Sequence, residues 1–206
     1  SVRSTRRSTR CLETQPVDGE AVPVTWSPCR PIHVVLNDDG APPGFEETLL
    51  DALGQVSAAT GFVFVYDGLT DEPADPYREE FQPERYGDRW APVLVAWTDE
   101  HAVQDFKGDV VGLALSTTAR DAFTRHLVRT SGYVYLDTDL RRYPRDPSGQ
   151  EPHVSVLLHE LGHLVGLDHV DDPSQLMDPQ DSGLLVTFQD GDRTGLAELA
   201  DASCAA

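Results

Sequence analysis

The sequence predicts an α/β fold in which a mostly parallel sheet packs against helices. Five short apolar segments have the length and composition of buried strands, and two longer segments show the apolar period of a helix. The predicted order is strand, helix, four strands and then a long helix, which favours a layered sheet-and-helix architecture. A chain of 206 residues is long enough for one domain with a substantial core.

The elements follow one another along the chain from Pro31 onward. The first strand is predicted at 32–37, where a short apolar run precedes a turn of two aspartates and a glycine. Residues 45–59 place apolar side chains at helical spacing, with two glutamates in the first turn and Gly61 at the end. The other predicted elements are strands at 62–66, 90–97, 109–116 and 131–137, a proline- and acid-rich loop at 69–90, and a final helix at 191–202.

Residues 1–28 show neither a helical nor a strand period, and Ser, Thr, Arg and Pro dominate them. We therefore expect an N-terminal extension, either a flexible arm or the remnant of a propeptide, in front of a folded domain at 29–206.

The charge balance limits the classes of partner. The chain carries 35 acidic and 16 basic residues, a net charge of −19, which argues against nucleic acid and anionic membranes. No apolar run is long enough to span a membrane, so we expect no membrane span. A monomer with a solvated acidic surface is the expected form.

The most informative stretch runs from His159 to His169 and reads H-E-x-x-H-x-x-G-x-x-H. Two histidines four residues apart lie on one face of a helix, so both imidazoles reach the same ion. Gly166 allows the helix to end and the chain to turn back, so that His169 supplies a third nitrogen. Three protein ligands leave one zinc position open, which is the pattern of catalytic rather than structural zinc sites.

Glu160 directly follows the first histidine and is placed to act as a general base toward water. A non-catalytic zinc-binding module would keep the three histidines but has no need of Glu160. A zinc hydrolase acting on a non-peptide substrate would share every residue of the motif, so this alternative stays open.

The motif resembles the zinc-binding signature of the metzincin metallopeptidases. Met177, the only methionine, follows in Leu-Met-Asp-Pro and looks like the Met-turn of the matrixin branch, in which Pro179 replaces the tyrosine of other branches. The resemblance implies a metzincin-type zincin fold: a five-stranded twisted sheet, two long helices, a cleft above the zinc, and a small C-terminal part with the Met-turn and a final helix. Met177 would shape the floor of the site without binding metal.

The same resemblance implies a secreted zinc-dependent endopeptidase that acts on proteins or peptides. It implies one catalytic zinc ion, held by His159, His163 and His169, with Glu160 as the catalytic base. It also admits calcium, although the chain has no Asp-x-Asp-x-Asp-Gly loop from which ligands could be named. The remaining histidines have no ligand spacing and are expected to be ordinary surface or loop residues: His33, His101, His126 and His153.

Three cysteines form an odd set without zinc-type spacing. Cys29 precedes the first strand and Cys204 follows the final helix, so we predict a disulfide between them that ties both chain ends to the domain. A Cys11–Cys29 bond is the main alternative.

A peptide substrate is expected to lie along an unpaired strand edge. In the fold that the sequence resembles, the strand bordering the cleft lies well before the zinc helix, and residues 109–116 are the candidate. This segment lacks proline and contains Gly112, which often marks close backbone approach. Predicted substrate-binding residues are Gly112, Leu113, Ala114 and, on the far wall of a pocket after the Met-turn, Pro179.

Overall fold

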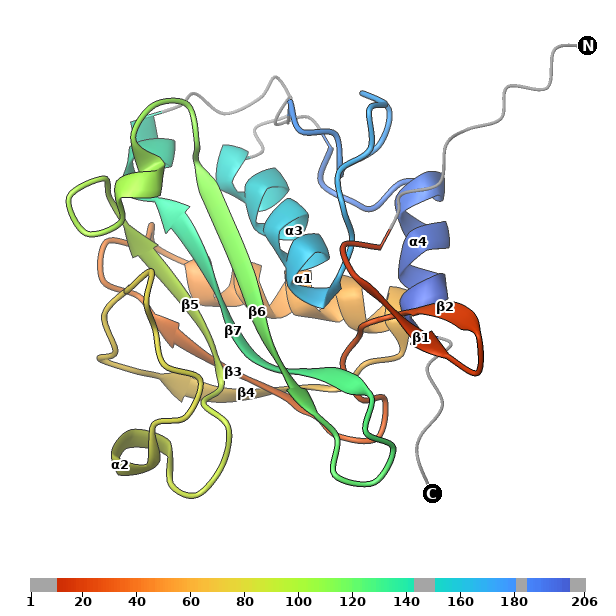
Figure 1. Cartoon of the computed structure of the whole chain (residues 1–206). Coiled ribbons are helices and arrows are strands. Elements are labelled where there is room, and N and C mark those ends of the chain that lie inside the picture. The colour runs from red at the N-terminus through yellow and green to blue at the C-terminus, as the bar shows by residue number, and fades with distance from the viewer. Residues whose placement is uncertain (1–10, 143–150, 181–184, 201–206) are drawn as a thin grey trace, which may run out of the picture.

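A computed structural model describes residues 11–142, 151–180 and 185–200 of the chain. It contains a five-stranded sheet with helices packed on one face, and a two-stranded hairpin near the N-terminus (Figure 1). The predicted α/β class, with a five-stranded and mostly parallel sheet, is confirmed.

The sheet has the strand order β4-β3-β5-β7-β6. Its strands are β3 (Ile32–Asn37), β4 (Phe64–Leu69), β5 (Val93–Thr98), β6 (Gly112–Arg120) and β7 (Leu127–Asp137). The first three and β7 are parallel, whereas β6 pairs antiparallel with β7 and forms one edge. β6 ends after its predicted end and β7 begins before its predicted start, because polar residues such as Arg120 and Arg129 continue the pairing where the apolar pattern stops.

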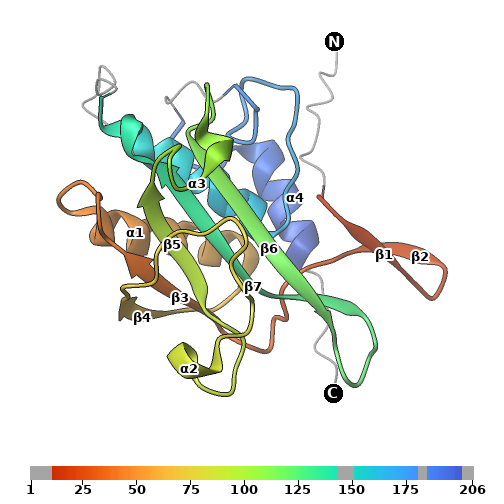
Figure 2. The ribbon, with the colours of Figure 1, turned by 60° about the vertical axis from the view of Figure 1, so that its left-hand side comes forward.

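Three helices lie on the same side of the sheet, as Figure 2 shows. They are α1 (Phe45–Thr60), α3 (Pro152–Val165) and α4 (Asp190–Ala200), and shorter turns occur at α2 (Pro83–Tyr86), η1 (Gln104–Phe106) and η2 (Thr138–Arg142). As predicted, α1 ends at Gly61 and α3 at Gly166, both with positive φ. No helix in the described ranges is both long and apolar enough to span a membrane.

Alternate residues of each strand fill two separate cores. Val34, Val95 and Val134 belong to the larger cluster between the sheet and the helices. Leu94 and Tyr135 point to the opposite face, where the connection between β4 and β5 covers them. Both sheet faces are therefore buried, as expected for parallel strands between two layers.

The N-terminal segment differs from the predicted extension. Residues 11–28 contain a hairpin of β1 (Thr14–Val17) and β2 (Glu20–Pro23). Beyond it, the Trp26 ring is buried and its Nε1 donates a hydrogen bond of 2.9 Å to the carbonyl oxygen of Leu164 in α3. This part of the segment packs on the domain, so the predicted boundary at residue 29 does not separate ordered from irregular chain. A propeptide origin stays a prediction.

The cysteines fall into two states. Cys29 is disulfide-bonded, and Cys11 is a half-buried free thiol. These states exclude the alternative Cys11–Cys29 bond. The predicted partner, Cys204, lies outside the described residues, so the Cys29–Cys204 pairing stays a prediction.

Candidate metal centre

Helix α3 is at once a core helix and the support of the candidate site. Its leucines at 157, 158, 161 and 164 are fully buried between the sheet and α1. This packing fixes the rotation of the helix about its axis, and with it the direction in which His159 and His163 point. The two histidines lie one turn apart on the same side.

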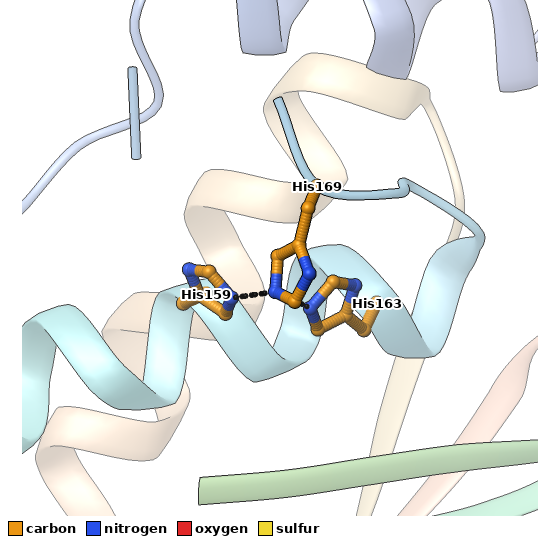
Figure 3. Close-up of side chains that lie close together, drawn as sticks. All are labelled: His159, His163 and His169. Carbon is orange, nitrogen blue, oxygen red and sulfur yellow. Dashed lines mark hydrogen bonds between the residues drawn. The ribbon is translucent and has the colours of Figure 1, made fainter. Parts of the chain in front are cut away.

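His169 reaches the same point from the loop after α3. At Gly166 φ is 121°, and the amide of Leu167 donates a hydrogen bond back to the carbonyl oxygen of Gly162. A side chain at Gly166 would be strained in this conformation, so glycine is what allows the sharp return. Figure 3 shows the His169 ring between the rings of His159 and His163.

The three ring nitrogens have the spacing that one metal ion requires. Nε2 of His169 lies 3.1 Å from Nε2 of His159 and 3.0 Å from Nε2 of His163. Tetrahedral zinc with bonds of 2.0–2.1 Å would hold its nitrogen ligands about 3.3 Å apart. Across the described residues, these three histidines form the only group of three or more His, Cys, Asp or Glu that converges in this way. The residues present therefore fit a zinc ion, and we assign no calcium ligand.

The second nitrogen of each helix histidine is held by a backbone carbonyl. His159 Nδ1 donates to the carbonyl oxygen of Leu176, and His163 Nδ1 donates to that of Leu167, both at 2.8 Å. These bonds place the proton on Nδ1 and leave the lone pair of Nε2 directed at the common point. Burial lowers the pKa of both imidazoles to about 4, so both are neutral at pH 7, as metal binding requires.

The segment around Met177 packs against helix α3 next to the candidate site. The Met177 side chain is fully buried, and a Cβ atom added to Gly162 would lie only 2.5 Å from its sulfur. Buried Asp192 of α4 accepts hydrogen bonds of 2.8 Å from the amide of Leu176 and 2.9 Å from that of Gln189. The turn that supplies the carbonyl for His159 is thus fixed to α3 on one side and to α4 on the other.

Glu160 lies beside the start of the edge strand β6. Its side chain is buried, with 7 % of the residue exposed, and it lies against Gly112. Of the other predicted substrate-binding residues, Leu113 and Ala114 are half-buried on opposite faces of β6, and Pro179 is exposed after the Met-turn. The strand predicted to border the cleft is thus an edge strand, and it begins next to Glu160.

Two histidines outside the motif have defined partners. The prediction that His153 is an ordinary surface or loop residue is wrong, because it is buried in α3 and its ring packs edge-on against Phe45 and Trp97. His33 is hydrogen-bonded to Asp67 at 2.9 Å, in a cluster that Arg89 completes.

Several supporting groups were not predicted. The carbonyl groups of Leu167 and Leu176 act through the backbone, so no side-chain pattern indicates them. Gly162 lies inside the motif, and the lack of a side chain there could have been attributed to close packing against Met177. Asp192 could have been noted as an acid in the first turn of the final helix.

The comparisons with known proteins agree with this geometry. No curated protein matches the chain. A family model described as Matrixin matches residues 91–199, just over half of the chain, from β5 through the candidate site to α4. Matrixins are zinc-dependent metallopeptidases, and they share the mixed sheet-and-helix architecture described above. On this match, with its motif and its fold, the chain belongs to the matrixin family.

Proposed function

We propose that this protein is an endopeptidase whose zinc ion is held by His159, His163 and His169. Two observations carry the proposal: Nε2 of His169 lies about 3 Å from Nε2 of both helix histidines, and the glutamate that follows His159 is buried. Zinc in such a site supplies a Lewis acid that polarises a carbonyl group and lowers the pKa of water.

Glu160 acts as the general base in this proposal. Its position in the motif, directly after His159, puts the carboxylate on the helix that carries two ligands. It takes a proton from the attacking water and passes it to the amine of the departing peptide. The burial of Glu160 limits exchange with bulk solvent, which favours transfer to the bound substrate.

The substrate is proposed to be an extended polypeptide that adds to the free edge of β6. β6 is the outermost strand on this side of the sheet. It pairs with β7 along one edge, and the other edge is the free one. Main-chain groups of Gly112, Leu113 and Ala114 would pair with the substrate, and Pro179 would border a side-chain pocket. Recognition through main-chain groups tolerates many side chains, so the pocket would set the cleavage preference.

The family resemblance also supports secretion. The catalytic domain is proposed to include the segment 11–28 that packs against α3. We propose that the protein acts as a monomer outside the cell.

A peptide library tests the function directly. The zinc-loaded protein is expected to cut internal peptide bonds, and a zinc chelator is expected to stop the cuts until zinc is restored. The alternative is a zinc hydrolase for a non-peptide substrate, and a parallel screen of ester, amide and glycoside substrates covers it. Zinc-dependent hydrolysis of one of these, with no peptide cut, would replace the proposal by this alternative.

A further inference from the structure

We propose that Gly112 is a positioning residue for Glu160, and that the missing side chain at 112 determines where the carboxylate can lie. This inference rests on the proposed role of Glu160 as the general base. It concerns the contact between the first residue of β6 and the helix that carries the motif.

The space that a side chain at 112 would need is already filled by the helix. A Cβ atom built on Gly112 would lie 2.6 Å from Oε1 and 2.8 Å from Cγ of Glu160. It would also lie 2.7 Å from Cγ1 of Val156, one turn earlier in α3. Carbon atoms pack at about 3.5–4.0 Å, so each of the three contacts is a steric clash.

Gly112 is required here for space and not for backbone conformation. Gly112 has no positive φ, whereas eight other described glycines do. An alanine could therefore adopt the backbone of residue 112 without strain, and only the added methyl group would disturb the structure. The effects of Gly112→Ala therefore come from the contacts of its methyl group with Glu160 and Val156.

The backbones on both sides resist movement. Gly112 is in register with Leu136 of β7, and the adjacent amide of Asp137 donates a hydrogen bond of 3.0 Å to the carbonyl oxygen of Val111. On the other side, the buried leucines of α3 fix the helix in the core. The atoms that yield most easily are therefore at the end of the Glu160 side chain.

Relief of the clash moves the carboxylate by a distance that matters for catalysis. Oε1 must retreat by about 0.8 Å to reach an ordinary contact of 3.4 Å. Catalytic groups act within about 0.5 Å of their productive position, and a misplacement of 1 Å can cost about 100-fold in rate. We therefore expect kcat to fall by about 10–100-fold in Gly112→Ala.

Other measured quantities should change little. Zinc content should stay near one per chain, because the clash does not involve the histidines. KM for peptides should remain within about threefold, because alanine keeps the N–H and C=O groups that would pair with a substrate. The matched control is Gly54→Ala in α1, where an added Cβ meets nothing within 4 Å and kcat should be unchanged.

A crystal structure of Gly112→Ala gives a readout independent of activity. The proposal requires the Glu160 carboxylate to be displaced relative to the wild type while the three histidines stay in place. A wild-type kcat, or an unmoved carboxylate, would overturn it. Failure of the wild-type protein to cut any peptide would instead overturn the proposed function, so the two failures are distinguishable.

The double variant Gly112→Ala/Val156→Ala separates positioning from packing, and also serves if the single variant folds poorly. It removes the stiff Val156 obstacle but leaves the clash with Glu160. We expect its thermal stability to recover relative to Gly112→Ala while kcat stays low. Recovery of kcat together with stability would mean that the methyl group acts only through helix packing, which would overturn the proposal.

Discussion

Each residue of the candidate site has a separable task. In His159 and His163 one ring nitrogen donates to a backbone carbonyl, which leaves the other for the metal. Glu160 shares their helix, but its proposed partner is water. Ligand and base can therefore be tested by different substitutions.

We predict that Glu160→Gln keeps about one zinc per chain and loses activity by about 10²–10⁴-fold. Glutamine preserves the shape of the side chain but cannot accept the proton, and general acid–base catalysis has this magnitude. His163→Ala should instead lose the metal, because it removes one of three nitrogen ligands. Zinc content by mass spectrometry and peptidase assays measure both. Near-normal turnover of the zinc-loaded Glu160 variant would show that another group is the base.

Glu72 makes stability depend on pH. Burial raises the pKa of its carboxyl, but hydrogen bonds from Arg78, Tyr86 and Gln82 outweigh burial, and the net pKa lies below its usual value. Because the folded-state pKa is below the unfolded value of about 4.3, the stabilisation is complete above that pH. It is lost as the pH falls through the folded-state pKa.

We therefore predict that Glu72→Gln lowers the free energy of unfolding, and that the loss is largest at pH 7, on the order of 3 kcal/mol. The reason is that the substitution leaves the guanidinium of Arg78 buried without its charge partner. The difference from wild type should shrink as the pH is lowered toward 3. Denaturant unfolding at several pH values measures it, with exposed Glu80→Gln as the control. A difference that is constant with pH would contradict this assignment.

Among the elements, those with a strong apolar period were predictable. Helix α1 and strand β3 lie at or within one residue of their predicted bounds, because Phe45, Leu49 and Val56 mark one helix face and Ile32 begins an uninterrupted apolar run. The three histidines and their helix were predictable for a different reason: metal ligation fixes both residue type and spacing.

The N-terminal hairpin was not predicted, although the chain carries a signal for it. Its strands have four residues each and no apolar alternation, so they resemble an irregular segment. The turn between them is Asp18-Gly19, with φ of 53° and 89°. Positive φ at both central residues is the type I′ geometry, for which Asp-Gly is a strong sequence indicator. Turn chemistry at this point was more informative than hydrophobic pattern.

We predict that removal of residues 1–28 destabilises the domain more than removal of residues 1–10. The longer deletion takes away buried Trp26, its bond to α3, and the carbonyl of Val24 that accepts a bond from buried Arg129. Loss of a buried Trp side chain alone typically costs about 3–5 kcal/mol. Thermal unfolding of both deletions measures the effect. Equal unfolding midpoints for the two deletions would show that the chain from residue 29 onward is enough for the full stability of the domain.

At the scale of the whole molecule, the candidate site lies where several segments of the chain meet: α3, the loop after it, α4 and the N-terminal segment. The proposed ligands come from α3 and from the loop beyond it, and Asp192 attaches the turn below the site to α4. On the other side, the N-terminal segment contacts the end of α3 through the amide of Leu12 and the carbonyl of Gly166. A metal ion bound by all three histidines would therefore stabilise the folded arrangement of the second half of the chain.

We predict that zinc removal lowers the midpoint of thermal unfolding without changing the fold. Zinc that binds the folded state stabilises it by mass action, by about 4 kcal/mol when its free concentration is 1,000 times Kd. For a chain of 206 residues this corresponds to a shift on the order of 10 °C. Calorimetry before and after chelation and reconstitution measures it, together with circular dichroism at 25 °C. Glu160→Gln should keep the zinc-dependent shift, because the glutamate is proposed to act as the base and not as a ligand, and His163→Ala should lose it. A shift that persists in His163→Ala would place the stabilising metal away from the three histidines.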